Sequence, residues 1–317
     1  KGTGLVTIRN TGKYISLLVL ESLFGVIVVV SNLTLIVILV IGWRKLLKND
    51  FYIVLANLLV CTSLKAFVEL GFIIPYYAMQ GDGAKRVRSQ AIDRSPSSTI
   101  QTGYFSGYYE LVIFNISVLA DYGVLFFSLL IAVNRLTTVS KESRSGSGDG
   151  RYCRIKTMFS CVLVWICSAL IPGLFLLFEC EYTYDDSMKI YRNVCGKDSD
   201  EVFLSLLDLL IYLSYICAAV ILLIYLLILR SLRNQRLSMH NAGNKSVFPT
   251  LQLQLLKQNL LVFCLYAISI LCVFTISFVQ PGHDFGFFEI AYIENLLNLS
   301  IAAAYPICFL VMSGELK

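Results

Sequence analysis

Long apolar runs recur along the chain and are separated by shorter polar segments. No charged side chain occurs in residues 22–42, 157–178, 209–229, 258–282 or 295–314. Each run has about 20 residues or more, which at a rise of 1.5 Å per residue spans a hydrocarbon core of roughly 30 Å. Two further stretches, 51–77 and 105–136, are equally apolar but contain a few charged residues. The pattern predicts seven transmembrane helices.

These runs predict a single domain covering residues 1–317, an all-α membrane protein built as a seven-transmembrane helix bundle. The helices are expected at about 14–42, 51–78, 106–136, 155–178, 202–230, 250–279 and 285–313.

Composition supports a membrane protein. Hydrophobic residues make up 57% of the 317 residues and charged residues only 15%, and the mean hydropathy is +0.72. A soluble domain of this size needs more polar surface to cover its core. The residues contain no metal-ligand spacing, phosphate-binding glycine loop or nucleophile constellation, so we expect neither an enzyme nor a metal or cofactor.

The distribution of lysine and arginine predicts the orientation. The three loops expected in the cytoplasm are rich in bases, whereas residues 179–201, in a loop expected outside, contain seven acids and three bases. The first outer loop, with four bases, departs from this rule. The pattern favours a plasma-membrane protein with its N-terminus outside and its C-terminus in the cytoplasm. The net charge of +5 then reflects basic residues on the cytoplasmic side, which anionic lipid headgroups would favour, and it does not indicate nucleic-acid binding.

Cys180 and Cys195 are the two cysteines in an expected outer loop, which faces an oxidising compartment. A disulfide between them would close a loop of about 15 residues and contribute about 3 kcal/mol. Two free thiols remain the alternative.

Charged residues inside the membrane are costly and commonly functional. Lys65 lies 14 residues after Phe51, and Asp121 lies 14 residues before Arg135, so both are expected about 21 Å from the cytoplasmic side. Glu69 shares the helix face of Lys65. These charges predict a ligand site. The alternative is that a Lys65–Asp121 or Lys65–Glu69 ion pair only fixes helix packing, and the two interpretations are compatible.

Four other acids lie nearer the helix ends. Asp208 and Glu294 are expected close to the outer surface, where they would join the ligand site. Glu21 and Glu110 are expected to reach the membrane interface with their carboxylates.

Arg135 follows Asn134 at the expected inner end of the third helix. Alone, it could be an ordinary cytoplasmic anchor. Together with other motifs, however, Asn134-Arg135-Leu136 resembles the Asp-Arg-Tyr motif of the rhodopsin-like receptor superfamily. The other matches span the expected helices: Ser31-Asn32 with the helix 1 Gly-Asn, Asn57-Leu58-Leu59 with the helix 2 Asn-Leu-Ala, Trp165 with the helix 4 tryptophan, Tyr225 with the helix 5 tyrosine and Tyr305-Pro306 with the helix 7 Asn-Pro.

This resemblance implies a rhodopsin-like bundle that couples an extracellular small molecule or peptide to a heterotrimeric G protein. Asn134, Arg135, Tyr225 and Pro306 would then serve coupling. Some positions depart from the superfamily: Thr62 replaces a sodium-binding Asp, and Glu110 replaces a disulfide-forming cysteine. These departures resemble nematode serpentine chemoreceptors of classes x and v, and so imply a chemosensory receptor. The alternative is a secondary transporter that uses the intramembrane charges, although the chain shows no internal repeat of the kind common in transporters.

Overall fold

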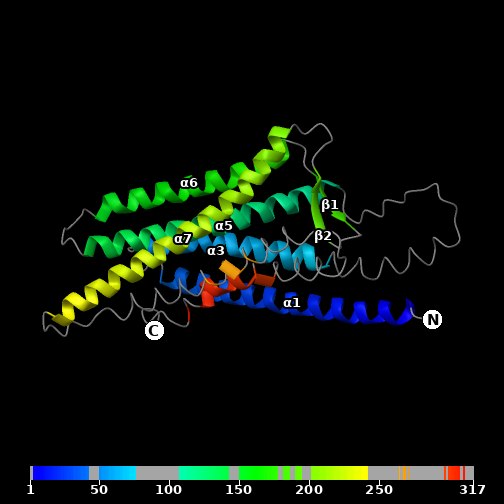
Figure 1. The fold of residues 1–317 in the computed structure, drawn as a ribbon, viewed down its shortest axis with the longest axis horizontal. Helices are drawn as coiled ribbons and strands as arrows, with labels where there is room; N and C mark the ends of the chain where they lie inside the picture. Colours follow the sequence, from blue (N-terminus) through cyan, green and yellow to red (C-terminus); the bar gives the residue numbers. More distant parts are fainter. Residues whose placement is uncertain are drawn as a thin grey trace.

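The computed structural model describes residues 3–42, 50–75, 107–142, 150–177, 181–185, 190–194, 201–241, 264, 267, 268, 271, 296, 297, 299–307 and 310. Most of them form long helices lying side by side (Figure 1). The helices are α1 (Thr3–Ile41), α3 (Asp50–Val68), α5 (Gly107–Glu142), α6 (Gly150–Leu177) and α7 (Glu201–Asn241), and a π-helical turn, η1 (Glu69–Ile73), continues α3.

Five described helices are long and apolar enough to cross a membrane, and the segments that meet this condition are Val19–Ile41, Asp50–Phe72, Leu111–Thr138, Arg154–Leu177 and Tyr212–Ser231. The first five expected helices are thereby confirmed. The sixth and seventh, at 250–279 and 285–313, lie largely outside the described residues, so the count of seven stays a prediction. The residues described within those two ranges are helical.

Two of the expected helix ends were wrong by about 11 residues. Helix α1 begins at Thr3 rather than near residue 14, and α7 continues to Asn241 rather than ending near residue 230. The apolar run marks where a helix leaves the membrane, but not where it stops. Arginine, leucine and glutamine are good helix formers, so Arg233 and Arg236, expected in a loop, lie on α7.

The outer faces of the helices are apolar. On α6 the exposed residues recur every three or four positions: Ile155, Phe159, Val162, Ile166 and Leu170 are all at least half exposed. Such a stripe on one helix face would be unfavourable in water and suits contact with lipid. The chain is therefore a membrane-embedded helical protein.

Helix α5 packs against α3, α6 and α7, and α1 packs against α3. Two glycines permit close approach. A Cβ on Gly123 of α5 would lie 2.6 Å from Cys61 Sγ on α3, and one on Gly25 of α1 would lie 2.6 Å from Leu70 in η1. Larger side chains at these positions would push the helices apart, so the glycines set how closely α5 approaches α3 and how closely α1 approaches η1.

Hydrogen bonds between side chains also link the helices. Trp165 of α6 donates its indole N–H to Asn57 Oδ1 of α3 at 2.8 Å, and Thr62 of α3 donates to Asn32 Oδ1 of α1 at 3.3 Å. Thr62 is buried and Asn57 is half-buried among the apolar residues of α3, where an unpaired polar group would be costly. These bonds fix the rotation of α3 about its own axis.

The helical residues near the C-terminus pack against the first two helices. Leu299, Ala302 and Ala303 share a buried cluster with Val28 of α1 and Ala66 of α3. In Figure 1 this red segment lies beside α1. The expected seventh helix therefore contributes to the core where the structure describes it.

A two-stranded antiparallel sheet lies between α6 and α7 in the chain. Strand β1 (Glu181–Asp185) pairs with β2 (Ile190–Val194), with Glu181 opposite Val194. The tyrosines, threonine, isoleucine and valine in these strands favour β-structure, a signal that the abundant acids of this segment obscured. The hairpin lies beside the start of α5 (Figure 1), and we call this end of the bundle the hairpin end.

Candidate functional site

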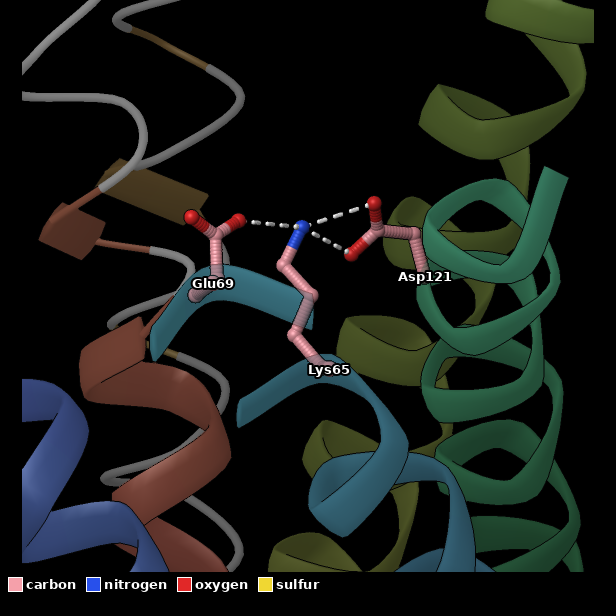
Figure 2. Close-up of polar contacts among 3 residues, drawn as sticks. All are labelled: Lys65, Glu69 and Asp121. Carbon is pink, nitrogen blue, oxygen red and sulfur yellow. Dashed lines mark hydrogen bonds and ion pairs between the residues drawn. The ribbon is translucent and has the colours of Figure 1, made fainter. Parts of the chain in front are cut away.

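Three charged side chains meet between α3, η1 and α5. The Lys65 ammonium lies 2.8 Å from Asp121 Oδ1, 2.9 Å from Asp121 Oδ2 and 3.4 Å from Glu69 Oε1 (Figure 2). Lys65 and Glu69 are four residues apart, so they share a helix face, whereas Asp121 comes from the neighbouring helix. The ion pair expected from the matched depths of Lys65 and Asp121 is confirmed, and so is the pair with Glu69.

The three side chains differ in exposure. The side chains of Lys65 and Glu69 are 6% and 2% exposed, whereas that of Asp121 is 45% exposed. A buried ammonium without partners would be strongly unfavourable, and two carboxylates within reach compensate for its desolvation. Lys65 therefore acts as a bridge that holds the acidic side chains of two helices together.

Close helix packing brings this cluster together. Cys61 lies one helical turn before Lys65 on α3, and Gly123 lies two residues after Asp121 on α5. Because Gly123 lets the two backbones approach at Cys61, the adjacent lysine and aspartate side chains can meet without spanning a wide gap.

Asp208 and Glu294, the other acids predicted for the ligand site, are not brought to the cluster by any described contact. Asp208 lies on α7, but its side chain is outside the described residues, and Glu294 is wholly outside them. Cys180 and Cys195 also lie outside the described residues. Each cysteine is the next residue beyond the Glu181–Val194 pair of the hairpin.

At the other end of α3 and α5, Arg135 contacts Phe51. Its guanidinium carbon lies 3.8 Å from the centroid of the Phe51 ring, within the range of a cation–π interaction. The carbonyl of the preceding residue, Asn134, accepts hydrogen bonds from the hydroxyls of Thr137 and Thr138 at 2.8 and 2.9 Å. Arg135 thus lies at a helix–helix contact.

The other two residues predicted for coupling are buried. Tyr225 packs with Ala132 of α5 and Ile221 of α7 in the cluster between those helices. Pro306 is buried in the C-terminal helical segment, next to Tyr305. Their contacts suit helix packing, and a role in coupling stays a prediction.

Sequence reasoning was wrong about Glu21 and did not foresee η1. Glu21 was expected to reach the interface but is 1% exposed, because it lies on the face of α1 that carries Gly25 and packs against η1. It lies one turn from Gly25, the residue that contacts η1. The π-helical turn η1 has no signature in this sequence. The one nearby signal is the pair of charges at Lys65 and Glu69, which marks the region but not the turn. Glu110, the other acid expected at the interface, lies on α5, and its side chain is outside the described residues.

Comparison with known proteins gives a fold and a family. Comparison with curated protein sequences finds no match. A crystal structure of squid rhodopsin is similar, with a TM-score of 0.69 and 14% sequence identity over 96% of this chain and 83% of the squid protein. At that identity the match shows that the fold is a rhodopsin-like helical bundle. Residues 96–317, more than half of the chain, match the family described as "Protein of unknown function (DUF621)", and the chain therefore belongs to the DUF621 family.

Proposed function

We propose that the chain is a chemosensory G-protein-coupled receptor that couples an extracellular ligand to a heterotrimeric G protein. The observation that carries this proposal is the spacing of two charged residues on α5, within a rhodopsin-like bundle. Asp121 lies in the Lys65–Glu69 cluster, and Arg135 lies 14 residues further along α5, about 21 Å away. One helix therefore joins a polar cluster within the bundle to a cation near its end.

In this proposal the ligand binds at Lys65, Glu69 and Asp121, with Asp208 and Glu294 nearer the outer surface. Ligand binding can shift a two-state equilibrium only by its different affinities for the two arrangements. We propose that the favoured arrangement frees Arg135 from Phe51 and exposes it to the G protein, while Asn134 lies beside it and the buried Tyr225 and Pro306 act through helix packing.

Several features support the receptor class and its orientation. A crystal structure of squid rhodopsin is similar over 96% of this chain, and the helix motifs resemble those of the rhodopsin-like receptor superfamily. The lysine and arginine pattern of the loops favours a plasma-membrane chain with its N-terminus outside. The chemosensory role rests on the resemblance of Asn134-Arg135, together with Thr62 and Glu110, to nematode serpentine chemoreceptors. The ligand would be a small molecule or a peptide.

A secondary transporter is the second candidate, and the buried ion pair favours it. A lysine held between two carboxylates could exchange partners as the bundle rearranges, as coupled charges do in transporters. Such a mechanism predicts movement of a solute across a sealed bilayer and needs no G protein.

The test uses the full chain in lipid nanodiscs with purified heterotrimeric G proteins of several classes. Binding of a non-hydrolysable GTP analogue should be faster than with empty nanodiscs, either without ligand or on addition of a panel of amines, carboxylic acids and peptides. Arg135→Ala should abolish this acceleration. Arg154→Ala, which removes an exposed base from α6, is the matched control and should retain it.

Two results together would favour the transporter over the receptor. Nucleotide exchange would be absent with every G-protein class, and proteoliposomes would take up a solute in a way that Lys65→Met abolishes.

A further inference from the structure

The cluster of Lys65, Glu69 and Asp121 contains one ammonium and two carboxylates, so its three groups carry a formal charge of −1. An ammonium has three N–H donors, and three carboxylate oxygens lie within 2.8 to 3.4 Å of the Lys65 nitrogen. An anionic ligand would have to displace one of these carboxylates to reach a nitrogen whose side chain is only 6% exposed. The cluster is therefore poorly suited to bind an anion.

Asp121 is the accessible member of the cluster. Its side chain is 45% exposed, while that of Glu69 is 2% exposed. A carboxylate offers about four lone-pair positions on its two oxygens, and Lys65 contacts each oxygen from one side (Figure 2). The exposed side of Asp121 thus keeps acceptor positions available to a second donor.

The location of Asp121 favours a ligand over lipid. It lies ten residues into the span Leu111–Thr138, about 15 Å from the start of that span. A carboxylate at such depth normally faces the bundle interior or a water-filled cavity. Ser117 is one helical turn closer to the hairpin end on the same face of α5 and is half-buried, so a second polar group lies on this face.

From this charge, exposure and depth we infer that the site binds an organic ammonium ion, with the carboxylate of Asp121 as its direct partner. Lys65 holds that carboxylate in place, and Glu69 supplies the additional negative charge. This inference names the ligand class of the proposed receptor site and so rests on the proposed function.

The test measures thermal unfolding of the purified full-length chain in detergent without any G protein. The probes are benzylammonium, its neutral analogue benzyl alcohol and its anionic analogue benzoate. A ligand that binds only the folded state raises the melting temperature as its concentration increases. Benzylammonium should do so, and the other two probes should not.

Matched variants locate the contact. Asp121→Asn should weaken the apparent affinity for benzylammonium at least ~10-fold, because the ligand loses the opposite charge that it contacts directly. Glu69→Gln removes the same charge but leaves the exposed carboxylate, so its loss should be smaller. Asp50→Asn removes an acid about 22 Å along α3 from Lys65 and should change nothing.

Equal stabilisation by all three probes, stabilisation by benzoate alone or none by benzylammonium would overturn the inference, and so would a wild-type response in Asp121→Asn. If that variant does not fold, the three probes on the unaltered chain decide. Stabilisation by benzylammonium without nucleotide exchange would support the ammonium site but contradict the proposed receptor function. Nucleotide exchange driven only by carboxylic acids would support the receptor function but contradict the ammonium site.

Discussion

The guanidinium carbon of Arg135 lies 3.8 Å from the centroid of the Phe51 ring, so the side chain at the end of the third expected helix rests on the start of the second. Phe51 is 7% exposed and belongs to the main core cluster. The ring is therefore well fixed, and it can hold the guanidinium in one place. A cation–π contact of this kind contributes about 0.5 to 2 kcal/mol.

We predict that Phe51→Leu raises nucleotide exchange in the absence of ligand by about 2- to 30-fold, the ratio that corresponds to losing that contact. Phe51→Tyr keeps an aromatic ring and should stay near the wild-type rate. The measurement is nucleotide exchange per folded chain in nanodiscs. Equal basal rates in the wild type, Phe51→Leu and Phe51→Tyr would show that the Arg135–Phe51 contact contributes to packing but does not restrain nucleotide exchange.

Loss of Lys65 should destabilise the chain more than loss of either acid. Lys65→Met leaves Glu69 and Asp121 facing each other without a cation, and breaking a buried pair costs about 3–5 kcal/mol. Asp121→Asn should cost less, because Lys65 keeps Glu69 and Asp121 is partly exposed.

Thermal unfolding of Lys65→Met, Asp121→Asn and the double variant measures the coupling between the two residues. It should exceed roughly 0.5 kcal/mol, the level for residues that do not touch. Additive losses would contradict the pair.

The close approach at Gly123 gives a prediction about packing. Gly123→Ala should lower the melting temperature although alanine is the better helix former, because the added Cβ would lie 2.6 Å from Cys61 Sγ. Cys61→Ala removes that sulfur and should restore part of the loss in the double variant. A melting temperature unchanged by Gly123→Ala would show that α3 and α5 separate easily here.

The hairpin register sharpens the prediction of a Cys180–Cys195 disulfide. Since Glu181 pairs with Val194, continuing the ladder by one residue would place the cysteines opposite each other. Directly opposed residues have Cα atoms about 4.5–5.5 Å apart, within the range for a disulfide. We expect neither thiol on intact cells to react with a membrane-impermeant maleimide until a reductant is added. Prompt labelling of both would exclude the bridge.

The orientation predicts which tags an antibody can reach. A tag before Lys1 should bind antibody on intact cells, and a tag after Lys317 should bind only after permeabilisation. The loop bases motivate this expectation. The reverse labelling would show that the bundle has the opposite orientation, with Arg135 on the outer side.

The sequence predicted depth along the helices better than rotation about them. Counting residues from helix ends placed Lys65 and Asp121 at one level, because the rise per residue is constant, and the structure pairs them. The expectation for Glu21 was wrong, because its burial depends on which face of α1 packs against η1. The rotation of α3 depends on Asn57, Thr62 and their partners on other helices, which no local pattern in the chain reveals.

The π-helical turn at Glu69 changes how this chain should be aligned with other helical membrane proteins. In η1 the amide of Ile74 donates to the carbonyl of Glu69, five residues back instead of four, so the turn holds one extra residue. One residue corresponds to about 100° of helix rotation. Ile74 and Pro75 therefore face a different side of the helix than their spacing from Lys65 implies. An alignment without a one-residue gap here would equate side chains that point in different directions.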